Sequence, residues 1–431
     1  MNYKEVVTSF LTIDQRILLL RRSQKVGTHR GQWSAVSGYL EGNEQPVTRA
    51  MTEIREEVGL SDDQINLLRE GEVLRAFDEG TETVWVIHPF LFEAKSSTVQ
   101  LDWENSEYRW IEPNQLASHE TVPKLREAFD RVHYDLQANP EALAGVLHGV
   151  GDVSGDRVHG ANFLGRQALQ LLSTAAQASD AKDTDALFYH VLLVFLRLRK
   201  AQPAMANVWN LTGKLLQAVD RERTTVASVD QLKTRVKELG QRIGEEAATA
   251  CEDASRNTAQ ILPQDGVVVT HSYSSTVLRS LELGFKSGKV FQVFATESYP
   301  GMEGKQLAKD LIALGISVRL IADSVVHSII PGANLVLVGA DSVFKDGSLI
   351  HKTGTGNIAI TAKKYGIPFC SSCETAKFSA QDFLGEHPTI PQGLFDLTPA
   401  ESVSNYITED GQVEPVGVEK RMMDMLKEIY S

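Results

Sequence analysis

Short β-rich runs alternate with helical segments after residue 265, and this alternation constrains the fold more than any other feature of the sequence. The runs are VVVT (267–270), FQVFAT (291–296), SVRLI (317–321), LVLVG (335–339) and IPFC (367–370). Strands that are separated by helices at this spacing are typical of a parallel sheet, because each crossover between parallel strands needs a long connection. The sequence therefore predicts a parallel-sheet α/β domain over residues 261–431.

The preceding part of the chain has a helical texture. Segments such as FLGRQALQLLSTAAQ (163–177) and VDQLKTRVKELGQRIGEEAATACEDASRNTAQIL (229–262) place apolar residues three and four positions apart. This spacing puts apolar side chains on one face of a helix. The segment HGVGDVSGDRVHGA (148–161) interrupts the pattern and is expected to be a loop before the first long helix. Residues 133–260 are therefore expected to form a helical subdomain.

Residues 1–132 form a third, β-rich part with one strongly marked helix. Its strand-like runs are Tyr3–Ile13, Gln15–Leu20, Thr83–Phe92 and Glu107–Ile111, with a turn at Asp14 and Gln15 between the first two. The helix is expected over Pro46–Val58. A chain of 431 residues is too long for one ordinary core, so a division into several domains is expected.

Composition excludes some classes of function. A hydrophobic content of 42% and a charged content of 23% are those of a soluble globular protein. The net charge of −13 argues against a nucleic-acid-binding surface over most of the chain. An anionic substrate would therefore be met by a metal ion or by a local basic pocket.

The sequence indicates neither a targeting segment nor a membrane span. The N-terminal run MNYKEVVTSFLTIDQRILLLRRS mixes acidic with apolar residues and has no small-residue cleavage site. No apolar run approaches the roughly 20 residues that a spanning helix needs. The cysteines, Cys251, Cys370 and Cys373, favour a reducing cytoplasm over a disulfide framework. The C-x-x-C pair formed by Cys370 and Cys373 is expected to be two buried thiols rather than half of a zinc site.

The helix over Pro46–Val58 carries the first candidate site. Glu53, Glu56 and Glu57 are spaced i, i+3 and i+4, so they share one face. Three like charges on one face call for a compensating cation, and oxygen ligands suit a hard ion such as Mg²⁺ or Mn²⁺. A solvated acidic face is the alternative interpretation of these three residues alone.

The residues around these glutamates resemble the Nudix box, in which a glycine, five residues, a glutamate and seven residues precede R-E-U-x-E-E-x-G-U, with U aliphatic. Residues 38–60, GYLEGNEQPVTRAMTEIREEVGL, match this pattern at every fixed position except one. The matching positions are Gly38, Glu44, Glu53, Ile54, Glu56, Glu57, Gly59 and Leu60. Thr52 stands where the family has arginine, which is thought to orient one of the glutamates.

This resemblance implies a Nudix α/β/α sandwich that hydrolyses a nucleoside diphosphate linked to another moiety. Glu53, Glu56 and Glu57 would be the catalytic residues and, together with the Gly38 carbonyl, would hold Mg²⁺ or Mn²⁺. The ions would neutralise the pyrophosphate and activate water. The substitution at Thr52 puts the efficiency of catalysis in doubt, but not the fold.

Seven segments after residue 150 resemble another family, which contains the regulatory subunits of translation initiation factor 2B and two sugar-phosphate isomerases. These isomerases act on methylthioribose 1-phosphate and ribose 1,5-bisphosphate. The segments are DRVHGA (156–161), RKAQPAMANVWN (199–210), VVVTHSYSSTVLRSL (267–281), TESYPGMEGKQLAKDL (296–311), VGADSVFKDGSLIHKTGTGNIA (338–359), CETAKF (373–378) and FDLTPAESVSNYITEDG (395–411). They occur in the family's order. The resemblance implies a Rossmann-like C-terminal domain, ligand-binding residues at Gly160, Ser272, Asp341 and Lys352, and a homodimer or a higher even oligomer.

The family's isomerases pair a cysteine with an aspartate as acid and base. The aspartate position is Asp341, whereas the cysteine position is Ser272, whose hydroxyl has a much higher pKa than a thiol. Two family arginines are replaced by Gln202 and Tyr299. We therefore expect a binding or regulatory module for a phosphorylated sugar or a nucleotide. A buried, hydrogen-bonded pair of Asp341 and Lys352 is the structural alternative.

The sequence is compatible with three functions. The first is a metal-dependent Nudix hydrolase whose C-terminal module binds a ligand or drives assembly. The second is a sugar-phosphate aldose–ketose isomerase with an appended Nudix domain. The third is a translation-factor-like regulator without enzymatic activity, for which initiation factor 2 or a relative would be the partner. In each case the expected location is the cytoplasm.

Overall fold

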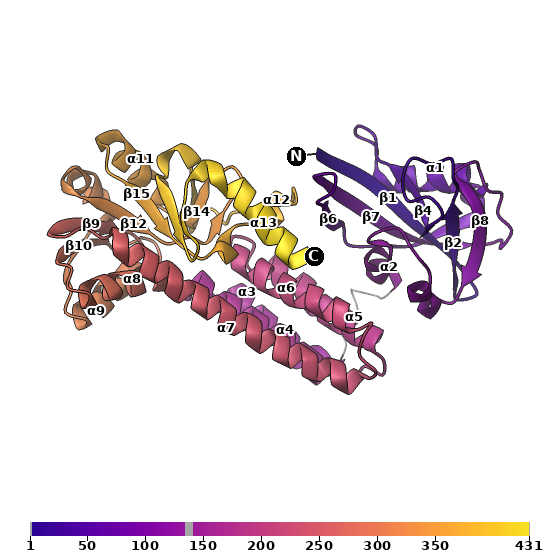
Figure 1. The fold of residues 1–431 in the computed structure, drawn as a ribbon, viewed down its shortest axis with the longest axis horizontal. Coiled ribbons are helices and arrows are strands. Elements are labelled where there is room, and N and C mark those ends of the chain that lie inside the picture. Colours follow the sequence, from indigo (N-terminus) through magenta and orange to yellow (C-terminus); the bar gives the residue numbers. More distant parts are fainter. Residues whose placement is uncertain (1, 134–140, 431) are drawn as a thin grey trace. The chain divides into compact units, whose positions relative to one another are not determined.

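The computed structural model describes residues 2–133 and 141–430. The chain divides into two compact units, residues 1–139 and 140–431, and each is described by itself below (Figure 1). The start of the predicted helical subdomain, residues 134–140, lies outside the described residues.

The N-terminal unit is built on a mixed eight-stranded sheet. Its strands are β1 (Asn2–Ile13), β2 (Arg16–Arg22), β3 (Trp33–Ser34), β4 (Val36–Tyr39), β5 (Ile65–Glu70), β6 (Leu74–Asp78), β7 (Thr83–Ala94) and β8 (Asn105–Ile111). The order is β3-β2-β1-β7-β5, with β4 paired to β1, β6 to β7 and β8 to β2. The β1–β7 pair is parallel. The predicted turn at Asp14 and Gln15 is confirmed, since both residues adopt a positive φ between β1 and β2.

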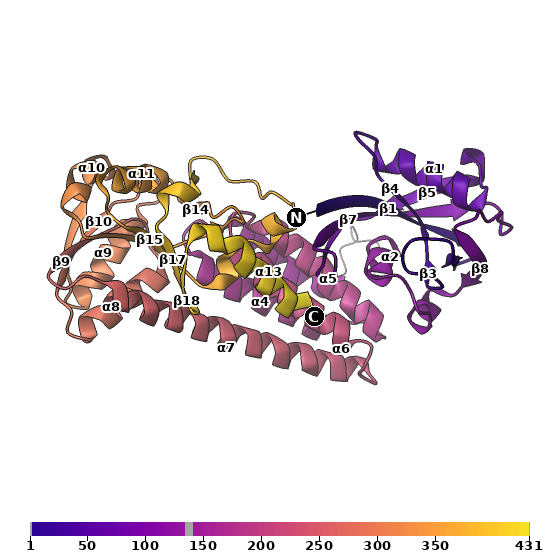
Figure 2. The ribbon, with the colours of Figure 1, turned by 45° about the horizontal axis from the view of Figure 1, so that its top comes forward.

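Two helices cover opposite faces of this sheet, as Figures 1 and 2 show. Helix α1 (Pro46–Val58) buries Ala50 and Ile54 against Leu11. Helix α2 (Leu125–His133) packs the ring of Phe129 on Phe10 of β1, with centroids 5.0 Å apart. The short 3-10 helices η1 (Asp62–Gln64) and η2 (Pro113–Ser118) lie in the connections. This is the expected α/β/α sandwich.

The C-terminal unit begins with helices. They are η3 (Glu141–Leu143), α3 (Ala144–Gly155), α4 (Ala161–Ala178), α5 (Thr184–Ala201), α6 (Ala206–Glu222) and α7 (Val229–Ile261). The prediction of a loop over 148–161 is wrong for its first half, which is helix α3. Val146, Val150 and Val153 are spaced four and three apart and are buried, so packing outweighs the low helix propensity of the glycines between them.

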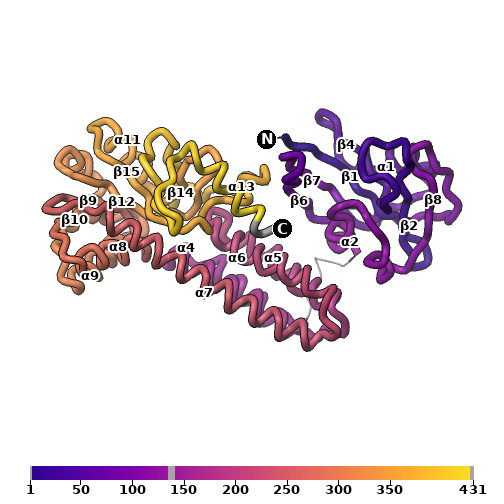
Figure 3. The backbone as a smooth tube through the Cα atoms, in the orientation of Figure 1, coloured from indigo at the N-terminus to yellow at the C-terminus, as the bar shows by residue number. Residues whose placement is uncertain are grey.

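Helix α7 is 33 residues long and connects the other helices to the sheet of this unit. The hydroxyl of Ser228 caps its N-terminus by accepting from the Gln231 N–H. Figure 3 shows it running alongside α4 and α6 and continuing to α8. Buried apolar side chains such as Leu232, Val236 and Ile243 line its first half. The predicted subdomain boundary at residue 260 falls at the end of this helix and stays a prediction.

The sheet of the C-terminal unit has seven strands in the order β11-β10-β9-β12-β15-β17-β18. They are β9 (Gly266–Thr270), β10 (Phe291–Thr296), β11 (Ser317–Ile321), β12 (Leu335–Val338), β15 (Phe369–Ser372), β17 (Asn405–Thr408) and β18 (Gly411–Val413). All neighbours are parallel except β17 and β18. The five predicted β-rich runs all contain or overlap strands of this sheet.

The remaining helices of this unit surround the sheet. The longer ones are α8 (Ser275–Lys286), α9 (Glu303–Ala313), α11 (Thr355–Tyr365) and α13 (Val418–Tyr430), and the short ones are α10 (Val326–Ile329) and α12 (Ala380–Phe383). Five 3-10 turns complete the set: η4 (Asp323–Val325), η5 (Ile330–Gly332), η6 (Thr375–Lys377), η7 (Ala400–Ser402) and η8 (Pro415–Gly417). The architecture is the expected Rossmann-like arrangement of helices and a mostly parallel sheet.

A second, three-stranded antiparallel sheet was not predicted. It consists of β13 (Ser342–Val343), β14 (Leu349–Lys352) and β16 (Phe395–Thr398). Strands of two and four residues are too short to show a periodic pattern in the sequence. The sheet matters for the site because Ser342 pairs with Ile350, which places the preceding Asp341 beside the following His351.

Candidate functional sites

The first candidate site is on helix α1, where the structure brings Glu53 and Gly38 into contact. Glu53 is buried, and its carboxylate lies against the backbone of Gly38 in β4. A Cβ atom on Gly38 would be 1.6 Å from Glu53 Oε1. The other glycine of the motif, Gly59, ends α1 with φ 71° and donates its N–H to the Arg55 carbonyl.

Glu57 is held by the sheet on both of its carboxylate oxygens. The Ser37 N–H donates to Oε1 at 2.9 Å, and the Asn105 side-chain amide donates to Oε2 at 2.8 Å. Burial raises the pKa of Glu57 to about 8, although both hydrogen bonds act in the opposite direction. Glu56, between the two buried glutamates, is exposed. The face therefore presents one free and two fixed carboxylates.

Arg49 is the residue that the sequence reasoning missed. It forms an ion pair with Glu53, one turn further along α1. Burial raises the pKa of Glu53, and Arg49 counteracts part of that increase. The hydroxyl of Thr52 instead donates to the Thr48 carbonyl of its own helix. The ion pair could have been predicted, because Arg49 and Glu53 are spaced i, i+4 on the same helix.

The donor set on this face fits a hard divalent cation. Glu53, Glu56 and Glu57 supply carboxylate oxygens, which are the ligands that Mg²⁺ and Mn²⁺ prefer. A buried carboxylate with a raised pKa also gains from a nearby positive charge. Within residues 2–133 and 141–430, however, no three acidic, histidine or cysteine side chains surround a common point. Glu53 is paired with Arg49 in this structure.

The second candidate site lies where the strand order of the C-terminal sheet reverses. From β9 the chain proceeds to β10 and β11 on one side, and then to β12, β15 and β17 on the other. Ligands of open α/β sheets bind at such a switch point, outside the carboxyl ends of the strands. Ser272 follows β9 and Asp341 follows β12, so the two residues flank this point.

Asp341 is bonded to His351 of β14. The imidazole Nδ1 lies 3.0 Å from Asp341 Oδ2, and both side chains are buried. Burial alone would raise the pKa of Asp341, but the hydrogen bond and the charge of His351 lower it, with help from Lys352 and Lys377. A buried carboxylate is therefore kept ionised next to an imidazole.

Lys352 has a different partner, because its ammonium lies 2.9 Å from Glu303 at the start of α9. The expected alternative of an Asp341–Lys352 hydrogen-bonded pair is therefore wrong. Successive residues of a strand point to opposite faces, so His351 reaches Asp341 while Lys352 turns towards Glu303. Each of the two contacts, Asp341–His351 and Lys352–Glu303, contains a residue of the predicted ligand set.

Ser272 adopts a left-handed conformation with φ 65° and is 1% exposed. Its N–H donates to Ser298 Oγ at 2.6 Å. The preceding His271 accepts from the Thr296 hydroxyl at 2.6 Å and donates to the Thr353 carbonyl at 3.0 Å. Burial lowers the pKa of His271 to about 4, and the charge of His351 acts in the same direction.

Gly160 lies beside the same loop. It caps α4, and a Cβ atom on it would be 4.0 Å from the Tyr273 carbonyl. In the first turn of α4, the Asn162 amide donates to the buried carboxylate of Glu374 at 3.0 Å. The helical part of the unit therefore contributes backbone to one side of the Ser272 loop.

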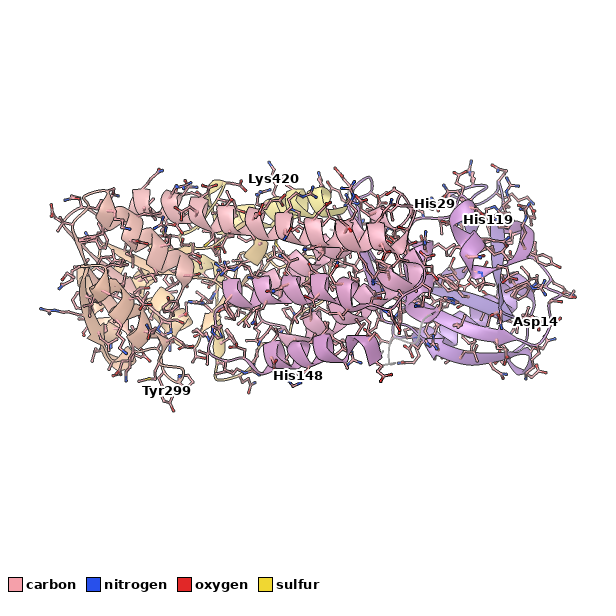
Figure 4. The ribbon with its side chains drawn as sticks, turned by 90° about the horizontal axis from the view of Figure 1, so that it is seen from below. Asp14, His29, His119, His148, Tyr299 and Lys420 are labelled. Carbon is pink, nitrogen blue, oxygen red and sulfur yellow. The ribbon has the colours of Figure 1, made fainter. Side chains whose placement is uncertain are left out.

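Neither residue at the substituted arginine positions supplies charge to this site. The amide of Gln202 is buried and donates to the Val153 and Asp156 carbonyls at 2.6 and 3.1 Å. Tyr299 is 73% exposed and points away from the body of the unit (Figure 4). Cys370 and Cys373 are buried free thiols, as expected, and burial raises their pKa values to about 11 and 12.

Comparison with known proteins agrees with both parts of the fold. Residues 3–132 match the NUDIX domain, and residues 157–391 match the family described as the initiation factor 2 subunit family. The fold and the sites thus define a NUDIX domain followed by a mostly parallel α/β unit with a switch-point site. The chain belongs to the initiation factor 2 subunit family and carries a NUDIX domain ahead of the family's region.

Individual relatives cover the C-terminal unit. A Pyrococcus furiosus protein, named translation initiation factor eIF-2B subunit 2-like, is 31% identical over 64% of this chain and 98% of its own length. The ribose 1,5-bisphosphate isomerase of Haloferax volcanii is 27% identical over 63% of this chain and 89% of its own length. The crystal structure of Pyrococcus horikoshii OT3 translation initiation factor eIF-2B has a TM-score of 0.54 at 28% identity, and covers 64% of this chain and 98% of that one. No helix in the described parts of the chain combines the length and apolar character of a membrane span.

Proposed function

We propose that the N-terminal unit is a metal-dependent hydrolase of a nucleoside diphosphate derivative. The observation that carries this proposal is the contact of the buried Glu53 carboxylate with Gly38, which requires a glycine at the first position of the motif. Mg²⁺ or Mn²⁺ would be held by Glu53, Glu56 and Glu57 together with the Gly38 carbonyl. When bound, the ion supplies positive charge for the pyrophosphate and an activated water.

The protein's own contribution is to fix the carboxylates. Ser37 and Asn105 hold both oxygens of Glu57, so this side chain keeps one orientation. Arg49 does the same for Glu53 from the preceding turn. Glu56 is exposed and free to turn towards an ion or a substrate. Two carboxylates of fixed orientation, Glu53 and Glu57, next to the exposed Glu56 suit a site that must bind and release a metal-bound diphosphate.

The test is turnover of a panel of nucleotide sugars, dinucleotides and nucleoside triphosphates with and without Mg²⁺. Substituting Glu53, Glu56 or Glu57 by Gln should each reduce turnover by about 100-fold or more, because an oxygen ligand with its charge is lost. Glu93→Gln is the matched control, since Glu93 is exposed on β7 and its carboxylate accepts from the Asn66 side-chain amide at 3.2 Å. Equal turnover in all four variants would refute the assignment.

For the C-terminal unit we propose binding of a phosphorylated sugar or a nucleotide at the switch point, together with assembly of the chain. Support comes from the grouping of Ser272, Asp341 and Lys352 at one end of the sheet, with Gly160 beside it, and from relatives named as ribose 1,5-bisphosphate isomerases. A ligand that binds only the folded unit raises its melting temperature. A thermal-shift screen with sugar phosphates and nucleotides tests this proposal.

Aldose–ketose isomerisation is a second candidate function for this unit. It is favoured by the ionised Asp341, which lies beside an imidazole at the carboxyl end of β12. It is opposed by the hydroxyl of Ser272 in place of a thiol. Incubation with ribose 1,5-bisphosphate or methylthioribose 1-phosphate, followed by a search for the ketose, decides between catalysis and binding.

A regulatory role without catalysis is the third candidate. The relative named as an initiation factor subunit supports it, and co-purification with initiation factor 2 would test it. The crystal structure of the tetrameric eIF2B-beta2-delta2 complex from C. thermophilum shares this fold at a TM-score of 0.56. A homodimer or a higher even oligomer is proposed for this chain, and light scattering of the full-length protein measures it.

A further inference from the structure

Two aromatic side chains form an exposed pair on the sheet of the N-terminal unit. Tyr39 is the last residue of β4 and Trp85 lies in β7, and their ring centroids are 6.1 Å apart with an angle of 34° between the planes. At this separation neither ring covers the other. Tyr39 is 51% exposed, and Trp85 is partly buried. The pair therefore leaves aromatic surface that another flat group can cover.

The register of the sheet explains why these two rings meet. Strand β1 lies between β4 and β7, with Val6 paired to Tyr39 and Lys4 paired to Trp85. Alternate residues of a strand point to the same face, so the two rings and Lys4 share one face of the sheet. The exposed ammonium of Lys4 is 5.7 Å from the centroid of Tyr39 and 5.3 Å from that of Trp85.

The pair is close in the chain to the carboxylates of helix α1. Tyr39 directly follows Gly38, whose backbone lies against the Glu53 carboxylate. Because successive strand residues point to opposite faces, only the thickness of β4 separates the Tyr39 ring from this carboxylate. Among the strands of the described residues, β4 pairs with β1 alone, so its outer edge is open. A ligand can therefore pass this edge and contact both faces.

The chemistry of the pair suits the base of a nucleoside. Nucleobases stack on aromatic side chains whatever their identity, because every base has a π face. The Lys4 ammonium only donates hydrogen bonds, and bases carry carbonyl or ring-nitrogen acceptors at their edges. The ribose separates the base from the diphosphate, so the two parts of one substrate can lie on either side of β4. A diphosphate without an aromatic base would gain nothing from the rings.

We propose that Tyr39 and Trp85 stack on the base of the nucleoside diphosphate derivative and that Lys4 donates to its edge. This assignment rests on the proposed hydrolase function of the N-terminal unit and adds to it the residues that select a nucleoside. The Nudix pattern leaves position 39 unspecified, and none of the three residues was among the site residues expected from the sequence.

The first test is a fluorescence titration of the full-length chain with AMP, GMP and UMP in the presence of Mg²⁺. Ribose 5-phosphate, which has no base, is the comparison ligand. A stacked base should quench the tryptophan emission of the wild type, and ribose 5-phosphate should not. Trp85→Phe keeps a ring at this position, so it should keep most of the affinity, measured by calorimetry, and lose most of the quenching.

Tyr39→Ala is the main variant. It should weaken binding of the three nucleotides by about tenfold, which is within the range measured for loss of a stacked base, and Tyr39→Phe should restore the affinity. Lys4→Met keeps the alkyl chain and removes the donors, so a smaller loss is expected. Leu68→Ala is the matched control, because Leu68 is 52% exposed but lies on β5, beyond β7 in the order of the sheet.

Hydrolysis kinetics give a second measurement. With ADP-ribose or UDP-glucose as substrate, Tyr39→Ala should raise KM by about tenfold and change kcat by less than about threefold, because the base does not take part in bond cleavage. The melting temperature should stay at that of the wild type. A fall in kcat and in melting temperature at unchanged KM would assign Tyr39 a structural role and overturn the base contact.

The remaining outcomes separate the base contact from the hydrolase function. Equal nucleotide affinity of the wild type and Tyr39→Ala would overturn the contact and leave the hydrolase function standing. Quenching by ribose 5-phosphate as strong as that by AMP would also overturn it. Absence of turnover together with quenching that depends on Tyr39 would refute the hydrolase function and support the base contact.

Discussion

The guanidinium of Arg49 pairs with the carboxylate of Glu53, one turn further along helix α1. The Nudix pattern places its arginine at the position of Thr52, directly before this glutamate. Positions 49 and 53 share a helix face because they are four residues apart. Arg49 therefore supplies from the preceding turn the cation that the motif places next to the glutamate.

We predict that Arg49→Ala lowers metal-dependent turnover by about tenfold, because partners that orient metal ligands contribute that much or more. The double variant Arg49→Ala/Thr52→Arg should recover most of the loss by returning an arginine to the motif position. The concentration of Mg²⁺ at half-maximal turnover is the decisive measurement. A purely structural role of Arg49 would change the melting temperature but not this concentration, and the second arginine would not restore activity.

Gly38→Ala should separate catalysis from stability. The added Cβ would overlap the carboxylate of Glu53, which can move aside only by giving up the orientation that its ion pair with Arg49 holds. We expect turnover to fall by about 100-fold, since ligand displacements of about 1 Å have effects of this size. The free energy of unfolding should change by no more than about 1 kcal/mol. Gly27→Ala is the control, because no atom lies within 4 Å of the added Cβ, and it should leave both quantities unchanged.

The buried His271 should make the C-terminal unit sensitive to acid. Its pKa is lowered from 6.5 to about 4 in the folded chain, so the unfolded chain binds the proton more readily. The stabilisation from neutral His271 is complete above pH 6.5 and is lost as the pH falls towards 4. The loss is on the order of 3 kcal/mol.

Urea unfolding of the C-terminal unit at pH 7 and pH 5 measures this effect. His271→Gln keeps a polar side chain that does not titrate, so it should flatten the decrease in stability between the two pH values. An unchanged pH dependence in this variant would assign the acid sensitivity to other groups.

Breaking the buried ion pair of Glu374 and Lys377 should strongly destabilise the C-terminal unit. The two charges are 3.2 Å apart, and both side chains are about 5% exposed or less. Lys377→Met leaves a buried carboxylate without its counter-ion, which costs about 3–5 kcal/mol. Lys214→Met is the control, since its partner Glu246 is 48% exposed and a surface pair contributes less than about 1 kcal/mol. Similar losses in the two variants, measured by urea unfolding, would contradict this prediction.

The sequence was sufficient to predict a helix or strand where the residues of that one element determine its bounds. Helix α1 was predictable from its first residue to its last, because Pro46 begins it and Gly59 ends it with a positive φ. The parallel strands were predictable because they are apolar runs between helices. Helix α3 was not, since its glycines weaken the local signal and only the burial of its valines reveals why it forms.

The partners of the site residues could not be predicted in the same way. Asp341 was expected at a strand end and lies there, but its bond to His351 depends on a sheet of two- and four-residue strands. The same holds for Glu57, whose donor Asn105 is 48 positions away in the sequence. Such pairings depend on tertiary contacts, and neither spacing nor composition encodes them.

The length of α7 has a mechanical consequence for the C-terminal unit. Near its C-terminus, Nε and Nη2 of Arg279 on α8 donate to the two carboxylate oxygens of Glu252, and the Asn257 amide donates to the Thr408 carbonyl of β17. The N-terminal half of α7 contacts α4 and α6, and Leu232 and Val236 are buried there. Because α7 is held by contacts at both ends, it cannot tilt at one end without moving at the other. A tilt of α8, whose first turn follows the Ser272 loop, would therefore have to move α7 along its 33 residues, as far as the other end of the helical bundle.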